Sequence, residues 1–138
     1  PGYLSTGDKA DVLVRLTTLV DRVEGLRLRV MATAMDVADL EGAPTVAAWL
    51  APRTRATARS LHGREQLARG MDRRWQLVGD GVNSGRVSMA QAEVIVRALE
   101  ASGGNQTKAA ALLGISIRTI NRKLKIYSQP AEHLQEVI

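Results

Sequence analysis

Apolar residues recur at three- and four-residue steps along most of the chain, which predicts helices rather than strands. The first pattern covers residues 8–40 and predicts one long helix. Its inner stripe is Val12, Leu16, Leu19, Val23, Leu26 and Val30. Asp8 and Asp11 favour the beginning of this helix and Gly42 its end, whereas Gly25 inside it costs about 1 kcal/mol relative to alanine. A helix of this length needs a partner along its stripe, and packing within the chain is favoured over a second chain.

Shorter patterns predict four further helices before Gly103-Gly104. They cover residues 45–50, 54–70 and 71–82, and a segment from Met89 to Gly103-Gly104. Their expected core positions are Val46, Ala47, Trp49, Leu50, Ala56, Leu61, Leu67, Trp75, Leu77, Val78, Ala92, Ile95, Val96 and Leu99. Ser88 and Gln91 have the spacing of a capping box. Because no segment alternates apolar and polar residues, the predicted fold class is all-α.

Residues 103–125 combine two short helical patterns that meet at Gly114. The patterns cover residues 106–113 and 117–126, and Ser116 lies where the second helix needs an N-cap. This stretch carries five Lys or Arg and no Asp or Glu. Two short helices, a tight glycine turn and a basic outer face are typical of a helix-turn-helix, whose second helix enters the major groove of DNA.

The geometry of a helix-turn-helix gives its polar residues separate roles. The start of the first helix offers backbone N–H groups to a phosphate, at Asn105, Gln106 and Thr107, although Asn105 alternatively serves only as an N-cap. The residues expected to neutralise phosphates are Lys108, Arg122, Lys123 and Lys125. The residues expected to face base edges are Ser116, Ile117, Arg118, Thr119 and Asn121. The alternative is a helix pair whose basic face is merely solvated, which the clustering disfavours.

This stretch resembles the C-terminal helix-turn-helix of the Fis family, which also ends many nitrogen-regulator-type activators. The matching residues are Gly104 to Thr107, Ala109-Ala110, Leu113-Gly114-Ile115, Thr119 and Arg122 to Lys125. The resemblance implies binding of double-stranded DNA as a dimer, with recognition helices roughly 34 Å apart. Fis-like modules often place Arg where this chain has Ile117. Since Ile117 cannot donate a hydrogen bond to guanine, binding is expected to depend on DNA shape and backbone.

A second resemblance covers about residues 8–100. The segments VDRVEGLRLRVMATAMDVAD, VAAWLAPRTR, MDRRW and GRVSMAQAEVIVRAL are similar to an all-helical actinobacterial domain of unknown function. That domain is often found upstream of HNH endonuclease domains. The only histidines, His62 and His133, are far apart and lack acidic companions at a suitable spacing, so no HNH metal site is expected.

Residue usage changes near Glu100. Residues 1–100 contain 13 Arg and 1 Lys, whereas residues 101–138 contain 2 Arg and 3 Lys, and valine gives way to isoleucine. The change predicts a join of two origins, and a natural fusion and an engineered chimera would leave the same pattern. Pro1 at the first position slightly favours an engineered chimera. The predicted domains are a bundle at 1–97, the Fis-like helix-turn-helix at 98–127 and a short helix or tail at 128–138.

Composition excludes several classes of protein. No cysteine is present, so neither a disulfide nor a thiolate metal site is expected. No apolar run is long enough to cross a membrane, and no signal peptide is visible, which predicts a cytoplasmic protein. Association with the nucleoid is expected if the chain binds DNA. The net charge of +5 weakly favours a polyanionic partner. No catalytic set, phosphate loop or small-molecule site is evident, so neither an enzyme nor a cofactor is expected.

Two further groups of residues, the arginines of residues 53–74 and the two tryptophans, have a structural interpretation that is favoured over a binding role. Arginines at positions 53, 55, 59, 64, 69, 73 and 74 form either a second nucleic-acid face or a solvated face interleaved with Glu65 and Asp72, and the second is favoured. Trp49 and Trp75 are expected in the core. The sequence therefore predicts a non-catalytic, dimeric DNA-binding protein of transcription-regulator or nucleoid type. The alternatives are a helical scaffold or chimera without DNA-binding activity, and an accessory fragment of an HNH nuclease.

Overall fold

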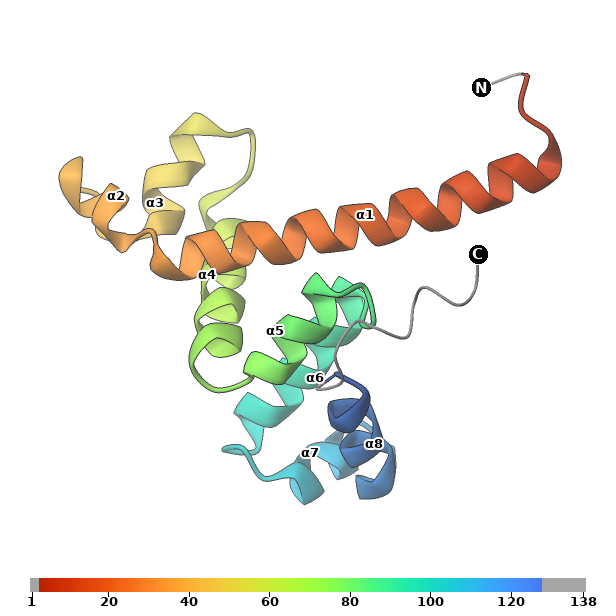
Figure 1. The fold of residues 1–138 in the computed structure, drawn as a ribbon. Coiled ribbons are helices and arrows are strands. Elements are labelled where there is room, and N and C mark those ends of the chain that lie inside the picture. The colour runs from red at the N-terminus through yellow and green to blue at the C-terminus, as the bar shows by residue number, and fades with distance from the viewer. Residues whose placement is uncertain (1–2, 128–138) are drawn as a thin grey trace.

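The computed structural model describes residues 3–127, and every regular element in that range is helical (Figure 1). The elements are α1 (Thr6–Thr33), α2 (Met35–Leu40), α3 (Val46–Leu50), the 3-10 turn η1 (Ala51–Arg53), α4 (Ala58–Arg73), α5 (Gln76–Asn83), α6 (Met89–Ala101), α7 (Gln106–Leu112) and α8 (Ile117–Tyr127). The all-α prediction with a C-terminal helix-turn-helix is therefore confirmed. The short helix or tail predicted at residues 128–138 lies outside the described residues.

The long N-terminal helix begins earlier and ends earlier than its apolar pattern indicated. Ser5 Oγ accepts a hydrogen bond from the Asp8 backbone N–H at 3.1 Å, and the Asp8 carboxylate accepts one from the Ser5 N–H at 3.2 Å. This capping box starts α1 at Thr6. The prediction of one helix to residue 40 is wrong, because Ala34 leaves helical geometry (φ −87°, ψ 23°) and α2 follows as a separate helix. The break lets Ala38 bury completely in the core.

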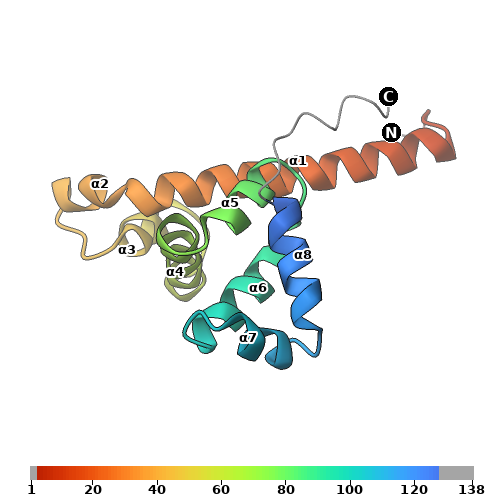
Figure 2. The same cartoon turned by 60° about the horizontal axis from the view of Figure 1, so that its bottom comes forward.

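The six apolar residues predicted as the inner stripe of α1 are exposed, with 40–59% of their surface accessible. The buried residues of α1 are instead Gly25, Leu28 and Met31, on the side that packs on α4 and α5. Gly25 is required there, because a Cβ would lie 2.8 Å from both Asn83 Oδ1 and Val82 Cγ1. The N-terminal end of α1 extends beyond the other described helices (Figures 1 and 2).

The boundary between the third and fourth predicted helices also differs. α4 starts at Ala58, where Thr57 Oγ1 accepts from the Ser60 N–H at 3.2 Å, so Ala56 is exposed outside the helix. α4 then continues through Gly70 to Arg73 instead of ending at that glycine. A Cβ on Gly70 would be in ordinary van der Waals contact with Val96 Cγ1 of α6, at 3.4 Å. Sequence position alone could not tell this glycine inside a helix from one at a helix end.

One hydrophobic cluster runs through the described chain, from Leu28 in α1 to Tyr127 in α8. All four core positions predicted in α6, Ala92, Ile95, Val96 and Leu99, are buried. Trp49 and Trp75 are half-buried and pack against this cluster, whereas Leu77 is 44% exposed. The upstream helices and the helix-turn-helix thus share one core.

The end of α8 meets α5 at Gly81, a buried glycine. A Cβ there would lie 2.7 Å from Val87 Cγ2 and 3.1 Å from Tyr127 Cγ. Nearby, Arg86 Nη1 donates to the Ile126 carbonyl at 2.9 Å and satisfies one of the last acceptors of α8. This close contact holds the recognition helix on the bundle.

Gly81→Ala is expected to lower the free energy of unfolding by about 1–3 kcal/mol, because the new methyl group overpacks the α5–α8 contact. Gly63→Ala is the matched control, since Gly63 lies inside α4 with nothing within 4 Å of its Cβ position. That change is expected to raise stability by about 0.5–1 kcal/mol. Urea denaturation followed by circular dichroism measures both, and equal effects at the two sites would contradict the packing argument.

Candidate nucleic-acid interface

The turn between α7 and α8 is built on Gly114, which adopts φ +65°. This left-handed conformation favours glycine and lets the Ile115 N–H donate to the Ala110 carbonyl at 3.0 Å, which closes the end of α7. Ser116 then starts α8, because its Oγ accepts from the Thr119 N–H at 3.2 Å. The predicted cap is therefore present.

The start of α7 is positioned from the upstream bundle. Gly103 and Gly104 both adopt positive φ, and the Gly104 N–H donates to the Leu99 carbonyl at 2.8 Å. A Cβ on Gly104 would lie 3.2 Å from Cη2 of Trp75, whose Nε1 donates to Glu100 Oε1 at 2.7 Å. Trp75, at the start of α5, therefore supports the loop that leads into the helix-turn-helix.

Two small residues let α7 approach its neighbours closely. Ala109 and Ala110 are buried and face the same core as Ile120 and Tyr127 of α8. Leu112, an apolar residue of the same helix, is 63% exposed. The α6–α7–α8 unit is thus a compact three-helix arrangement at one end of the molecule (Figure 1).

The outward face of α8 consists of Arg118, Asn121, Arg122 and Lys125. At 100° per residue these four side chains lie on one side of the helix, opposite Ile120 and Tyr127, and all four are exposed. No Asp or Glu occurs between residues 101 and 127. Lys108, Arg118, Arg122 and Lys123 form no ion pair within the described part of the chain. On this face, Arg118 and Arg122 therefore carry positive charge with no acidic partner among the described residues.

Other predicted site residues lie around this face and several have structural roles. Thr119 is half-buried, and its hydroxyl lies 2.9 Å from Ser116 Oγ. Asn105 Oδ1 accepts from the Lys108 N–H at 3.0 Å, so Asn105 is the N-cap of α7. Gln106, Thr107 and Lys108 are exposed beside it.

Two predicted residues lie at the edges of the α8 face. Ile117, at the first position of the helix, is 43% exposed. Lys123 is half-buried and borders an apolar hollow between α6 and the turn, lined also by Val94, Ile95 and Ile115. Its aliphatic stem therefore packs on apolar side chains, as is common for lysine.

The arginines predicted as a cluster at residues 53–74 differ from Arg118 and Arg122 of α8, because four of the seven have acidic partners within the described chain. Arg69 pairs with Glu65 at 2.6 Å, Arg74 with Glu100 at 3.4 Å, and Arg64 with Glu24 at 3.5 Å. Arg53 pairs with Glu41. The positive charge of this cluster is therefore partly compensated, which supports the solvated interpretation.

Glu65 is a residue that sequence reasoning did not identify as special. Its side chain is 2% exposed, and Oε2 accepts from the Ala47 N–H at 3.1 Å near the start of α3. A carboxylate at a helix start complements the free N–H groups and the helix dipole. Only the tertiary contact between α3 and α4 reveals this role, because 18 residues separate the two partners.

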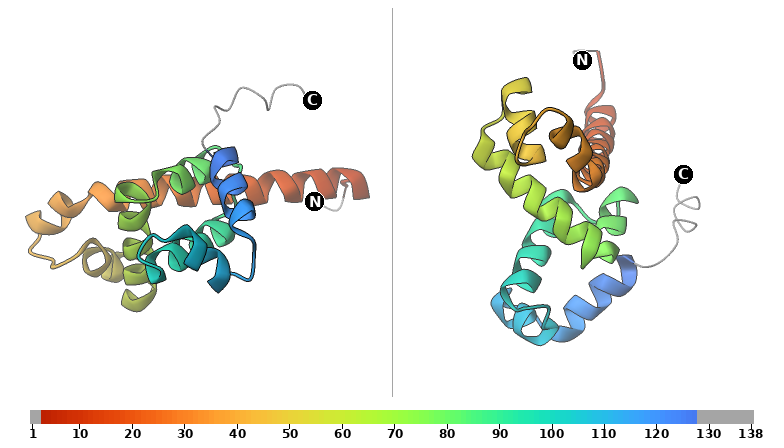
Figure 3. Two further views of the ribbon diagram at one scale, coloured as in Figure 1. Left: turned by 90° about the horizontal axis from the view of Figure 1, so that it is seen from below. Right: turned by 90° about the vertical axis from the view of Figure 1, so that its left-hand side faces the viewer.

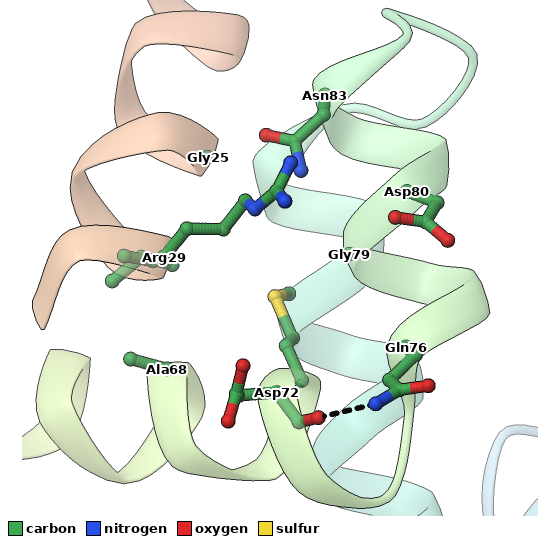
Figure 4. A pocket seen from close by; sticks show the side chains of 10 residues that line it. Gly25, Arg29, Ala68, Asp72, Gln76, Gly79, Asp80 and Asn83 are labelled. Atoms are coloured by element: carbon green, nitrogen blue, oxygen red, sulfur yellow. Dashed lines mark hydrogen bonds between the residues drawn. The ribbon is translucent and has the colours of Figure 1, made fainter. Parts of the chain in front are cut away.

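A cavity of ≈ 190 Å³ lies between α1, α4 and α5 (Figure 4). Arg29 of α1 extends across it towards Asn83, and the carboxylates of Asp72 and Asp80 lie at its rim. Gln76 Nε2 donates to the Asp72 backbone carbonyl at 2.9 Å. Within residues 3–127 no three His, Cys, Asp or Glu side chains come close enough to hold a metal ion.

Comparison with known proteins identifies one match. Residues 87–127 match the model of the Fis family of bacterial regulatory proteins, a range that spans α6, α7 and α8. No curated protein and no solved structure matches the chain significantly. No described helix is long and apolar enough to cross a membrane. The family match and the geometry together support a DNA-binding helix-turn-helix of the regulator type.

Tyr127 provides a pH-sensitive contact at the base of this unit. Burial raises the pKa of its hydroxyl, which is buried without a hydrogen-bond partner in the described chain. A raised folded-state pKa means that the stability is complete below the unfolded value of 10.0 and falls as pH rises through the folded value.

We therefore expect the free energy of unfolding to fall above about pH 10 in the wild type. In Tyr127→Phe this alkaline loss should shrink, and stability near neutral pH should be retained or raised, because the ring still packs and an unsatisfied hydroxyl is removed. Chemical denaturation at several pH values measures both effects. Tyr3→Phe is the control, because Tyr3 is 89% exposed. An alkaline profile unchanged by Tyr127→Phe would contradict the assignment.

Proposed function

We propose that this chain is a non-catalytic, double-stranded DNA-binding protein of the transcription-regulator type, which acts as a homodimer carrying two helix-turn-helix units. The observation that carries the proposal is the outward face of α8. Its four polar residues are exposed, opposite the buried side of the helix, and no carboxylate lies within the helix-turn-helix. A chromosomal DNA partner would place the protein in the cytoplasm, at the nucleoid.

In this proposal α8 enters the major groove with Arg118 and Asn121 towards the base edges. Arg122 and Lys125 contact phosphates on the same face, and Lys108 contacts a phosphate from α7. Gln106 and Thr107 lie beside Lys108 and present exposed polar groups to the same strand. Ser116, Thr119 and Asn105 support the interface through the caps described above.

Backbone contacts dominate this proposed interface. Ile117 has no hydrogen-bond donor on its side chain, so it contributes at most an apolar contact with a thymine methyl group. Few side chains remain for direct base readout. The proposed binding therefore depends strongly on salt concentration and only modestly on DNA sequence.

A helical scaffold without DNA-binding activity is the competing function. It would be favoured if the basic side of α8 were buried against the bundle. The side that packs on the bundle carries Ile120 and Tyr127, and the cationic side stays accessible. This arrangement supports DNA binding over a purely structural role.

Arg122→Ala is expected to weaken binding to a duplex roughly tenfold and to reduce the slope of log affinity against log salt by about 1, because one phosphate contact is lost. Arg55→Ala is the control: it removes the same charge from an exposed arginine upstream of α4, which forms no ion pair with described residues. Fluorescence anisotropy at two salt concentrations measures both. The proposal fails if the wild type does not bind, or if both variants behave alike.

Ile117→Arg is expected to strengthen binding about tenfold at sites that offer guanine to the start of α8, and less elsewhere, because arginine can bond to guanine O6 and N7. Ile117→Lys is the matched comparison, since it adds the charge without the bidentate geometry. A panel of duplexes that differ at one base pair measures the preference. A similar gain at every duplex would indicate that residue 117 meets only the DNA backbone.

A further inference from the structure

The exposed apolar stripe of α1 repeats at a coiled-coil spacing. Its six residues, Val12, Leu16, Leu19, Val23, Leu26 and Val30, are separated by steps of four, three, four, three and four residues. This is the average period of 3.5 that keeps one seam of a helix facing a partner helix. The stripe spans 18 residue steps, which is about 27 Å of helix. Leu13 and Val20, both exposed, widen it on one side.

The stripe faces away from the other helices that the structure describes. Gly25, Leu28 and Met31 define the buried side of α1, and their directions on the helical wheel are opposite to the centre of the stripe. No described element of the chain packs on the stripe, because α4 and α5 occupy the other side. The apolar stripe of α1 is therefore a surface that no described part of the chain covers.

We propose that a second copy of this chain covers the stripe, and that the two α1 helices pair antiparallel as a short coiled coil. The proposal deepens the proposed function, because it names the surface that forms the dimer, and it rests on that function only for what the dimer binds. Three features of α1 support a second copy as the occupant: the match of side-chain sizes, the available apolar area, and the distribution of charge.

The stripe fits the same stripe of a second copy that runs in the opposite direction. If Asp21 of the two chains marks the two-fold axis, Val12 meets Val30 of the second copy, Leu16 meets Leu26, and Leu19 meets Val23. Each pair joins residues of equal or nearly equal size. Val20 then lies beside Val20 of the second copy, next to the axis. In a parallel pair Val20 would instead face Arg15.

The exposed apolar area of the stripe is close to that of a standard protein–protein interface. A leucine or valine side chain carries roughly 100 Å² of apolar surface, and a little over half remains exposed on these eight residues. Two copies therefore present about 900 Å² of apolar surface for burial. A standard interface of about 1,600 Å² contains roughly 900–1,000 Å² of apolar surface, so the stripe is near the usual requirement.

Charge also favours the antiparallel direction. Residues 6–14 of α1 carry Asp8, Lys9 and Asp11, whereas residues 22–30 carry three arginines and one glutamate. Antiparallel pairing places the acidic end of one helix beside the basic end of the other, and it also opposes their helix dipoles. Arg22, on the flank of the stripe, is turned back to its own chain, where its Nε donates to the Asn83 carbonyl at 3.2 Å.

This pairing determines where the two helix-turn-helix units lie. α1 and the α7–α8 unit lie on opposite sides of the molecule (Figures 1 and 3). The helical wheel places the stripe on the side of α1 opposite its buried residues. The two units therefore lie on opposite sides of the paired α1 helices. The spacing of roughly 34 Å expected from the family resemblance belongs to dimers that pair close to the helix-turn-helix, and it does not apply to this arrangement.

The test measures oligomeric state without DNA, by size-exclusion chromatography with light scattering at tens of micromolar chain. The wild type is expected to be a dimer and Leu19→Asp a monomer, because the charge enters the centre of the seam. Val14→Asp is the matched control: Val14 is on the same helix and 68% exposed, but outside the stripe, so this variant stays dimeric. Circular dichroism verifies that each variant remains folded. A monomeric wild type, or a dimeric Leu19→Asp, overturns the proposal.

Direction is tested with single cysteines in this cysteine-free chain. Leu16→Cys and Leu26→Cys chains are expected to form a disulfide-linked dimer when mixed and oxidised, and neither is expected to do so alone. Cross-linking of either variant alone would overturn the antiparallel arrangement. DNA binding is measured separately on the wild-type dimer, so a dimer that binds no duplex refutes the proposed function and leaves this interface intact.

Discussion

The contact between α5 and α8 at Gly81 is the constraint on which the position of α8, the second helix of the helix-turn-helix, depends. No side chain fits there, because Val87 and Tyr127 occupy the space of a Cβ. Tyr127 in turn ends α8, whose other buried residue, Ile120, belongs to the same core. Since close-packed interiors transmit small displacements, the outward face of α8 is held by the bundle and not by α7 alone.

The positive charges of the chain have acidic neighbours on one surface and few on the other. Arg64 and Arg69 of α4 and Arg74 after it lie beside glutamates of α1, α4 and α6, which compensate their charge. The cations of α7 and α8 lie in a segment without acids. Arginine therefore has different surroundings on the two surfaces. Arg64, Arg69 and Arg74 form solvated ion pairs, whereas Arg118 and Arg122 of α8 have no acidic partner among the described residues.

The α1 helix is the element whose tertiary role differs most from its sequence pattern. The heptad spacing of its stripe predicts a surface that faces a partner helix, but no residue between 3 and 127 covers it. The residues that hold α1 on the bundle, Gly25 among them, lie on the other side. The more regular apolar periodicity of α1 thus belongs to its exposed side, and the buried side is marked by only a few residues.

The sequence by itself determined the helical class, the start of α6 at Met89 and the helix-turn-helix with its caps at Asn105 and Ser116, because these depend on local periodicity, capping and glycine turns. The tertiary structure alone decided which side of α1 is buried, where α4 ends, and that Glu65 caps α3. These features arise from contacts between residues far apart in the chain. A periodic pattern reports that a face is apolar, but what covers that face depends on the packing of the other helices.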